Sequence, residues 1–394
     1  MHSQFIHPRY DQQGFASIPS RVEKAFNSGN YDAVVLFLVD GFGWRFYELF
    51  QDAAFIQRIA KQGRIEKLIS QFPSTTAAHI TTIQTGLPVG VSGVYEWFYY
   101  EPQLDQVIAP LLFSFAGTLE RDTLKPTGIR PEDLYPRGIF YPTLKKMGVD
   151  SYVFGTSEYT PSTYSGVVMA GAEQRAFRTF SESLINVKLL VENQTKPTYI
   201  YLYFDRIDTI SHRYGPSAQQ TEAEIDTFLL TMEHYFERIF KGKKRILFLM
   251  PADHGQVAVN PETTIYLNID PRFAGVERFL KVNRSGQLLV PAGSARDMFL
   301  YVKEDVLDEA QSFLSKRLEG KADIVKVNSL IEQGYFGPEV STRFRERVGN
   351  LVILPYEYES VWWYEKNKFE QRFYGHHGGL TPHEMETILY SYEF

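Results

Sequence analysis

The segment AVVLFLVDGFG at residues 33–43 decides the fold class. Its residues from Ala33 to Val39 are continuously apolar and rich in β-branched side chains, as in a strand that is buried on both faces of a sheet. The run ends in Asp40, and a helical pattern of apolar residues follows from Trp44 to about Ile59. A fully buried strand that leads into a helix is typical of an α/β protein with a parallel sheet.

Further short apolar runs along the chain extend this pattern. They lie at Tyr199–Phe204 and Ile246–Met250, and a weaker one lies at Ser151–Phe154. Helical patterns separate them, and the longest of these, Ser217–Phe240, begins after a Gly-Pro turn. Because strands alternate with helices, we expect an α/β fold with a mostly parallel central sheet and helices on both faces.

The stretch 268–370 departs from this alternation. It opens with a hairpin-like region that is punctuated by Gly and Pro. Beyond that region we predict a strand, a helix and a second strand, at Asp297–Lys303, Asp305–Leu318 and Ala322–Val327. This order of elements indicates an α+β cap that is inserted into the core. The catalytic core then comprises residues 1–267 and 371–394, and a second insertion is expected at about 97–138.

Composition limits the classes of function. The 394 residues carry a net charge of −6 and the Lys and Arg residues form no basic stripe, so we expect no nucleic-acid polymer as a partner. Cysteine is absent, which excludes disulfides, thiolate metal sites and a cysteine nucleophile. Neither a signal peptide nor an apolar run of membrane-spanning length is recognisable. We therefore expect a cytoplasmic protein without a membrane partner, and the oligomeric state stays open.

Acidic residues and a histidine follow three of the predicted strands. Asp40 follows the first, Asp205 and Asp208 follow the second, and Asp253 and His254 follow the third. Ligand crevices of open α/β sheets lie at the carboxyl ends of the strands, so we expect these side chains to lie close together. A single aspartate at such a position is as often a turn or helix-cap residue. Several of them beside a histidine point instead to a metal site.

Two further histidines complete the candidate ligands. Asp208 and His212 are four residues apart, so on a helix both side chains share one face and can hold one ion. His377 lies in the segment GHHGG at 375–379, where glycines permit close approach of the backbone to a ligand. All of these groups are oxygen or nitrogen donors, which suit zinc or manganese.

A reacting hydroxyl is expected in the segment FPSTTAAH at 72–79. This segment precedes a predicted helix that runs to Gly86, and the N-terminus of a helix favours anions through its backbone N–H groups. Ser74 or Thr75 can cap that helix, and capping is compatible with catalysis because several hydroxyls are available. A threonine must be activated before it acts as a nucleophile, and coordination by a metal ion is one way to do so.

Taken in order, these motifs resemble the alkaline phosphatase superfamily, and within it the type I phosphodiesterase/nucleotide pyrophosphatase family. The matching segments are VDGFG at 39–43, FPSTTAAHITTIQTGLPVGVSG at 72–93, DTISHRYGP at 208–216, ADHG at 252–255 and GHHGGLTPHE at 375–384. The resemblance implies an alkaline-phosphatase-like core and two bound zinc ions, with manganese as an alternative. The ligands that it implies are Asp208, His212 and His377 for one ion, and Asp40, Thr76, Asp253 and His254 for the other.

The resemblance also implies that Thr76 is the catalytic nucleophile. Thr76 lies three residues after Pro73 and ten before Gly86, as in the family pattern, and Thr75 is the alternative. The implied reaction is hydrolysis of a small phosphodiester or pyrophosphate through a covalent phospho-threonine. A phosphomonoesterase or phosphonate hydrolase stays open as an alternative, and so does a metal-dependent phosphomutase or transferase.

Two positions depart from the family pattern. Ala77 stands where nucleotide pyrophosphatases carry a ring that stacks on the base, so another ring would be needed, and the aromatic run Tyr95–Tyr100 belongs either to that role or to the core. His79 replaces an asparagine that contacts phosphate, and we expect His79 to bind the substrate as a hydrogen-bond donor. Arg296 and Lys303 of the expected cap are further candidates for contacting an anionic substrate.

The other histidines and one aspartate lack support from a motif. We expect His376 to lie beside the site or at the surface, and Asp205 to support the site without binding metal. The remaining histidines are expected to be structural or surface residues; they are His2, His7, His234 and His383.

Overall fold

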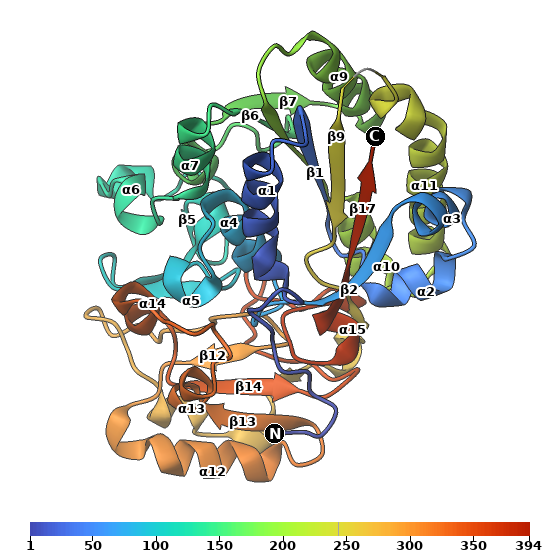
Figure 1. Ribbon diagram of the computed structural model, residues 1–394. Coiled ribbons are helices and arrows are strands. Elements are labelled where there is room, and N and C mark those ends of the chain that lie inside the picture. Colours follow the sequence, from blue (N-terminus) through green and yellow to red (C-terminus); the bar gives the residue numbers. More distant parts are fainter. Residues whose placement is uncertain (243) are drawn as a thin grey trace.

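The central element of the structure is a seven-stranded sheet with the strand order β2-β17-β9-β1-β8-β6-β7 (Figure 1). The computed structural model describes residues 1–242 and 244–394. The strands of this sheet are β1 (Ala33–Val39), β2 (Arg64–Ile69), β6 (Asp150–Thr156), β7 (Glu173–Phe177), β8 (Thr198–Phe204), β9 (Ile246–Pro251) and β17 (Glu386–Glu393). β1 is parallel to β8 and β9, and β6 is parallel to β7 and β8. β17 runs antiparallel to both of its neighbours, β2 and β9, and the other pairings of the described sheet are parallel, so the predicted mostly parallel sheet is confirmed.

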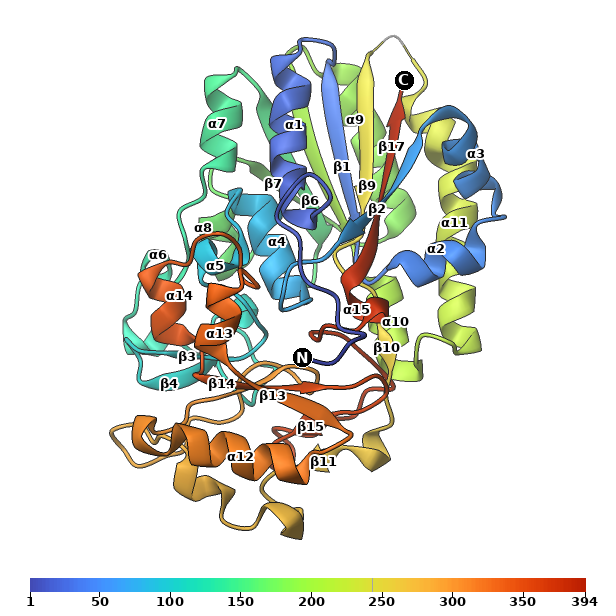
Figure 2. The same ribbon diagram turned by 60° about the horizontal axis from the view of Figure 1, so that its bottom comes forward.

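Helices cover both faces of the sheet (Figure 2). Along β1, Val34, Leu36 and Leu38 belong to one hydrophobic cluster, whereas Val35 and Phe37 belong to another, as expected for alternating side chains. The first cluster is closed by α1 (Ile18–Asn27), α4 (Thr76–Thr85), α7 (Phe140–Lys146) and α8 (Thr163–Val168). The second is closed by α2 (Trp44–Phe50), α3 (Ala54–Gln62), α9 (Phe180–Asn193), α10 (Arg206–Tyr214) and α11 (Gln219–Phe240). The uninterrupted apolar sequence of β1 therefore reflects a strand that is buried on both sides.

The helical pattern from Trp44 to Ile59 forms two helices, α2 and α3, instead of one. The chain turns between them, and Ala53 adopts extended backbone angles as the N-cap of α3. This turn lets Phe46 of α2 and Phe55 of α3 pack into the same hydrophobic cluster. One straight helix cannot follow the curvature that these contacts require, and the local pattern does not reveal the break.

A smaller unit lies beyond the lower end of the central sheet in Figure 1. It holds a three-stranded antiparallel sheet of order β12-β14-β13. Its elements are β12 (Met298–Leu300), α12 (Leu307–Arg317), β13 (Ala322–Lys326), α13 (Val327–Glu332), α14 (Thr342–Arg347) and β14 (Leu351–Pro355). The predicted strand, helix and second strand of this stretch are thus present in the expected order. We propose that residues 268–370 form a cap over the carboxyl ends of the central strands.

Short elements connect the core to this unit. Between α4 and α7 lie α5 (Val89–Ser92), β3 (Tyr99–Glu101), β4 (Gln106–Ala109), β5 (Ser114–Phe115) and α6 (Pro131–Leu134). Nearer the C-terminus lie β10 (Val257–Ala258), β11 (Ile265–Tyr266), β15 (Val361–Trp362), β16 (Gly375–His376) and α15 (Pro382–Met385). The 3₁₀ helices span Phe15–Ser17, Pro110–Leu112, Lys125–Thr127, Pro261–Thr263, Pro271–Phe273, Val276–Phe279 and Glu304–Val306. Among the described residues, the helices are too short or too polar to cross a membrane.

Candidate active site

The carboxyl ends of three neighbouring strands bring the predicted acidic residues together. Asp40 follows β1, Asp208 lies on α10 after β8, and Asp253 follows β9. The turn after β1 requires a glycine, because Gly41 has a φ of +72° and a Cβ atom there would lie 3.0 Å from the Asp208 Cβ. That close approach joins the end of β1 to α10, so the parallel register of the sheet collects carboxylates from distant parts of the sequence.

Two groups of possible ligand atoms form around His254. Asp40, Asp253 and His254 each contribute an atom to one group, and the atoms all lie within 4.8 Å of one another. Asp208, His254 and His377 form a second group by the same measure. The Nε2 atom of His254 lies 3.3 Å from the Asp40 Oδ1 and 3.4 Å from the Asp253 Oδ2. His254 therefore stands at the junction of the two groups.

His212 borders the second of these groups. Its Nε2 lies 3.3 Å from the Asp208 Oδ2, because the spacing of four residues places both side chains on one face of α10. The Nε2 of His377 lies 3.8 Å from the other oxygen of Asp208. The structure thus brings together the residues that the family resemblance implies, and it adds one feature, which is that His254 reaches both groups.

The histidines are oriented by backbone carbonyls. The Nδ1 atom contacts the carbonyl of Gly375 at 2.7 Å in His212, that of Gly255 at 3.1 Å in His254, and that of Ser74 at 2.9 Å in His377. A carbonyl accepts only a donated proton, so each Nδ1 carries the hydrogen and each Nε2 keeps a lone pair that faces a carboxylate. This arrangement is typical of histidines that bind metal.

Burial of these carboxylates destabilises the folded chain unless a cation balances their charge. Burial, together with the charges of the neighbouring aspartates, raises the pKa of Asp40 well above its usual range and that of Asp253 to about 7. The Asp253 Oδ2 is buried and has no hydrogen-bond partner within the described chain. Burial also lowers the pKa of His254 and His377 well below the ordinary value, which keeps both rings neutral. Neutral imidazoles beside carboxylates are a donor set that fits divalent cations.

Thr76 is the hydroxyl that reaches this cluster. It is the first residue of α4, and its Oγ1 lies 3.1 Å from the His254 Nε2 and 3.4 Å from both carboxylate oxygens of Asp40. Thr75 is the N-cap of the same helix, and its buried side chain contacts Glu96 instead. The geometry therefore favours Thr76 over Thr75 as the reacting residue.

His79, which was expected to bind the substrate, is buried and hydrogen-bonded within the protein. His79 is fully buried, its Nδ1 contacts the carbonyl of Thr75 at 2.6 Å, and its Nε2 accepts the N–H of Gln71 at 3.0 Å. The Nε2 also lies 2.8 Å from the hydroxyl of Ser70. Burial lowers the pKa of His79 to about 4, so the ring is neutral and its one proton is already donated. His79 instead ties the first turn of α4 to the segment that precedes it.

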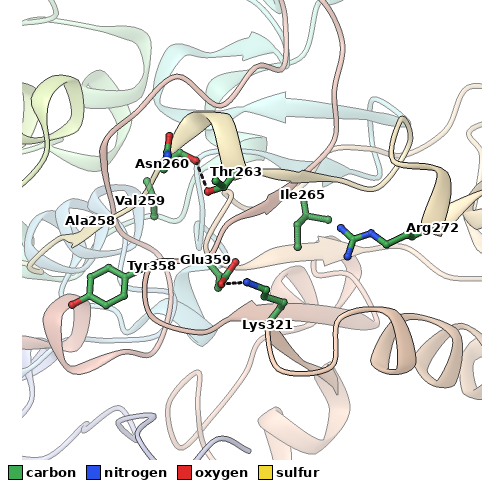
Figure 3. Close-up of a pocket in the computed structure, with 9 residues that line it drawn as sticks. All are labelled: Ala258, Val259, Asn260, Thr263, Ile265, Arg272, Lys321, Tyr358 and Glu359. Atoms are coloured by element: carbon green, nitrogen blue, oxygen red, sulfur yellow. Dashed lines mark hydrogen bonds and ion pairs between the residues drawn. The ribbon is translucent and has the colours of Figure 1, made fainter.

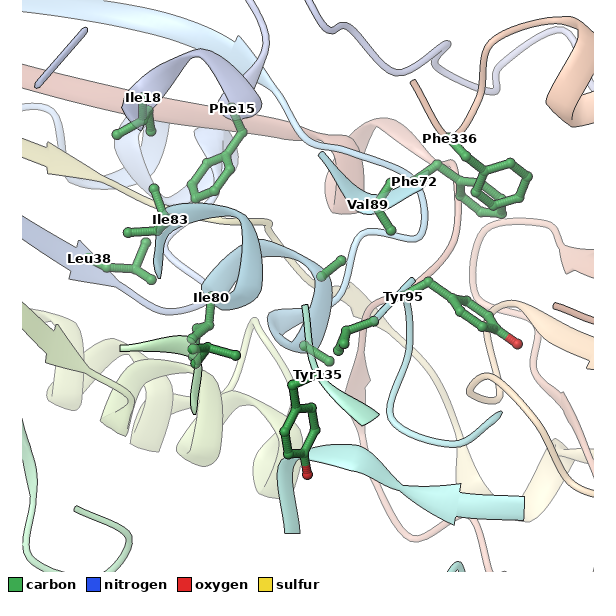
Figure 4. Packing of buried hydrophobic residues seen from close by; sticks show 14 of the residues in the cluster. Phe15, Ile18, Leu38, Phe72, Ile80, Ile83, Val89, Tyr95, Tyr135 and Phe336 are labelled. Atoms are coloured by element: carbon green, nitrogen blue, oxygen red, sulfur yellow. The ribbon is translucent and has the colours of Figure 1, made fainter. Parts of the chain in front are cut away.

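Arg296 and Tyr95 of the aromatic run are also buried within the protein. Arg296 is fully buried, and its guanidinium forms an ion pair with Glu384 at 2.9 Å. It also donates to the carbonyl of Tyr356 at 2.8 Å, so it holds the loop after β14. Lys303 is exposed and donates to the carbonyl of Arg278. Tyr95 of the aromatic run packs in the hydrophobic core (Figure 4).

The remaining residues without motif support have other contacts. Asp205 accepts a hydrogen bond from the Tyr159 hydroxyl at 2.9 Å, next to the cluster. His376 is buried, and its ring lies edge-on to that of His212 with centroids 5.5 Å apart. The other four histidines contact surface or cap residues: His2 with Asp323, His7 with Gln333, His234 with Arg238 and His383 with Glu357.

Two supporting residues escaped the sequence analysis. The hydroxyl of Tyr203 donates to Asp40, and Nε2 of Gln256 donates to the Asp208 Oδ1 at 2.5 Å. Tyr203 belongs to the apolar run of β8, where a tyrosine is indistinguishable from a core residue. Gln256 directly follows the ADHG segment, so its position beside that motif is the signal that was available.

A cavity of about 590 Å³ lies at the junction of core and cap (Figure 3). Residues of the segment 258–272 line it on one side, and Lys321, Tyr358 and Glu359 line it on the other. Lys321 and Glu359 form an ion pair there. The lining includes none of the predicted ligands, and the reacting groups lie elsewhere, at the ends of the central strands.

An α/β sheet whose strand ends gather carboxylates, imidazoles and a hydroxyl at a helix N-terminus has the donor groups of a metal-assisted hydrolase. A family model described as type I phosphodiesterase / nucleotide pyrophosphatase matches residues 34–380, and the chain belongs to that family. The predicted resemblance, and with it the alkaline phosphatase superfamily, is therefore confirmed. Among the curated proteins, no significant match was found.

Solved structures share the fold at low sequence identity. Murine ectonucleotide pyrophosphatase / phosphodiesterase 5 is 15% identical, with a TM-score of 0.66 over 91% of this chain and 87% of that chain. An inactive variant of the murine protein was solved in complex with AMP, with a TM-score of 0.65. Phosphonoacetate hydrolase from Sinorhizobium meliloti 1021, in complex with phosphonoformate, is 16% identical, with a TM-score of 0.61 over 91% of this chain and 89% of that chain.

Proposed function

We propose that the chain is a metal-dependent phosphodiesterase or pyrophosphatase that acts on small phosphate esters through a covalent phospho-threonine on Thr76. The observation that carries this proposal is the position of the Thr76 Oγ1, 3.1 Å from His254 and 3.4 Å from Asp40, at the start of a helix. A nucleophile in contact with two groups that accept its proton, at an anion-favouring helix end, has what phosphoryl transfer requires.

The cofactors that we propose are two zinc ions, with manganese as an alternative. Their protein ligands would be Asp40, Asp253, His254 and Thr76 for one ion and Asp208, His212 and His377 for the other, with His254 adjoining both. When bound, such ions polarise phosphate oxygens and lower the pKa of a coordinated hydroxyl. The orphaned Asp253 Oδ2 and the inward-facing Nε2 atoms support this assignment.

Each residue of the site has its own role in the proposed reaction. The Thr76 hydroxyl gives its proton to a neighbouring acceptor and its Oγ1 bonds to phosphorus. The ester oxygen leaves and takes up a proton, and the phosphoryl group is carried on Thr76. Water then attacks the same phosphorus, which releases the phosphate product and restores the hydroxyl. Asp40 and His254 orient the hydroxyl, and the backbone N–H groups of the first turn of α4 favour the negative charge that develops on the phosphate.

A phosphonate hydrolase is the second candidate function. It is favoured by the structural likeness to phosphonoacetate hydrolase, which was solved with phosphonoacetate and with phosphonoformate. Because His79 and Arg296 are both occupied inside the protein, neither supplies contacts that would distinguish a diester from a phosphonate. A phosphomonoesterase, and a phosphomutase or transferase, remain alternatives on the same donor set.

The test compares turnover of four substrates by the purified protein with zinc or manganese. They are bis(p-nitrophenyl) phosphate, p-nitrophenyl phosphate, p-nitrophenyl thymidine monophosphate and phosphonoacetate. We expect the diesters to have the higher kcat/KM, and expect the Thr76→Ala variant to be inactive while it still binds metal. Preferential turnover of the monoester or of phosphonoacetate would replace the leading proposal, and transfer to an added alcohol in place of water would favour a transferase.

A further inference from the structure

Three exposed aromatic residues lie on the segments around His212. Phe373 and Tyr374 directly precede β16, and Tyr214 is the last residue of α10, two positions after His212. Their exposed fractions are 44%, 48% and 39%. Single exposed apolar residues are ordinary on protein surfaces, but neighbouring rings at the edge of a ligand site indicate a contact surface for the ligand.

Phe373 is the ring of this group that touches the candidate site. Its centroid lies 4.6 Å from that of His212, with an angle of 41° between the planes, and 5.6 Å from that of His376. On its other side, His212 directs Nε2 to Asp208 at 3.3 Å. A single imidazole therefore separates the exposed ring of Phe373 from the carboxylates of the cluster.

The backbone around Phe373 is fixed by hydrogen bonds. The N–H of Phe373 donates to the Oε1 of Gln371 at 2.6 Å, and the carbonyl of Phe373 accepts from the Nε2 of Gln371 at 2.9 Å. Gln371 is buried, and its own N–H donates to the Tyr266 hydroxyl at 3.0 Å. The N–H of Tyr374 donates to the carbonyl of His212 at 2.8 Å. The segment is thus held at both ends, and its ring is presented to solvent in a defined place.

Tyr374 and Tyr214 lie on the two segments that meet beside Phe373. The carbonyl of Tyr374 accepts from the N–H of Val259, which fixes the strand beside β10. A Cβ atom on Gly215 would lie 3.6 Å from the Tyr374 Cβ, so the end of α10 and Tyr374 are in close contact. The guanidinium of Arg213 lies 5.2 Å over the ring of Tyr214. We name Tyr214, Phe373 and Tyr374 the aromatic rim.

We propose that the aromatic rim, through Phe373, binds an aromatic or flat apolar group that is attached to the phosphorus of the substrate. This inference rests on the proposed function of the neighbouring cluster as a phosphate site. A ring bound there gains edge or offset contacts with Phe373 and removes apolar surface from water. Within the aromatic run, Tyr95 and Tyr99 do not compete for this role, because they are buried against each other in the core.

The test measures the binding of two phosphonates that differ only in the attached group, phenylphosphonate and methylphosphonate, to the zinc-loaded protein by calorimetry. We expect the natural protein to bind the phenyl compound about tenfold more tightly, as one aromatic contact allows. In Phe373→Ala, the two phosphonates should bind with affinities within about twofold of each other, and the affinity for methylphosphonate should change little. Phe373→Leu should give an intermediate ratio.

Leu230→Ala is the matched control, because Leu230 is an exposed apolar residue on α11 outside the aromatic rim, and its ratio should equal that of the natural protein. An unchanged ratio in Phe373→Ala overturns the inference. Equal weakening of both phosphonates also overturns it, since Phe373 would then only support His212. Hydrolysis of bis(p-nitrophenyl) phosphate by the natural protein is measured separately, so a failure of the proposed function is seen as absent turnover and not as a changed binding ratio.

Discussion

The imidazole rings of His254 and His377 stack with their centroids 3.7 Å apart and their planes 18° apart. They come from distant parts of the sequence, one after β9 and the other after β16. Two protonated rings would repel one another at this distance, and burial lowers the pKa of both well below the ordinary value. The stack therefore requires neutral rings, which is the state in which histidine binds a metal ion.

Replacement of Thr76 tests the nucleophile directly. We expect Thr76→Ala to lower kcat for bis(p-nitrophenyl) phosphate by about 10³-fold or more, because no other group takes the place of the lost oxygen. Thr76→Ser keeps a hydroxyl and should retain measurable turnover. Thr75→Ala is the matched control, and its side chain faces Glu96, so its kcat should stay within about tenfold of the natural protein. A larger fall in kcat for Thr75→Ala than for Thr76→Ala would show that Thr75 is the nucleophile.

Asp253 should make the metal-free protein less stable as the pH rises from about 4 to about 7, and Asp40 should act in the same direction. Burial and the neighbouring aspartates raise the pKa of Asp40 and of Asp253, so the folded state still holds protons that the unfolded state has lost. A folded state that binds more protons loses stability with rising pH. Thermal unfolding after treatment with a chelator checks this, and Asp40→Asn should show a smaller slope. Added zinc should remove the decrease, because cations bind the ionised carboxylates.

His79 should matter for stability and not for substrate affinity. We expect His79→Ala to lower the free energy of unfolding by about 1–3 kcal/mol, since it leaves the buried N–H of Gln71 and the carbonyl of Thr75 without their partner. The KM of the folded variant should change by less than about threefold. Denaturant titration and steady-state kinetics on the same preparation separate the two effects. A large rise in KM with unchanged stability would restore a substrate-binding role.

Arg296 provides a second contrast between sequence and structure. Arg296→Met should lower the free energy of unfolding by about 3–5 kcal/mol, because it leaves Glu384 buried without its ion-pair partner. The double variant with Glu384→Gln should be destabilised by less than the sum of the two single changes. Lys303→Met, at an exposed position of the same unit, is the control and should be nearly neutral. Additive losses would show that the pair is not coupled.

The features that were predictable from the sequence depend on local spacing. The apolar run of β1 predicts a strand that is buried on both faces, and alternation with helices predicts the parallel sheet. Asp208 and His212 share a face of α10 because the helical repeat brings residues four apart together. The family pattern also located the ligand candidates, whose role in binding metal stays a prediction.

What the sequence left undecided depends on contacts between distant segments. Arg296 and Glu384 are 88 residues apart in the chain, and nothing in the local pattern of either reveals that they pair. The sequence alone does not distinguish the rings of the run Tyr95–Tyr100 from the ring of Phe373. The structure shows that Phe373 lies exposed beside His212. Spacing reports which face of an element a residue occupies, whereas the packing partner of that face is set by tertiary contacts.

By itself, the sequence determined the class of fold, the strand ends that carry the acidic residues, and the segment that supplies the threonine. These three features follow from local sequence, because hydrophobic periodicity and the signals for the start of a helix each involve only a few neighbouring residues. Only the tertiary structure shows that Thr76 and not Thr75 contacts Asp40, and that His254 adjoins both groups of ligands. It also shows that the ring of His79 is hydrogen-bonded inside the protein. Each of those outcomes depends on where β1, β9 and α4 meet, and that meeting is a property of the whole packed chain.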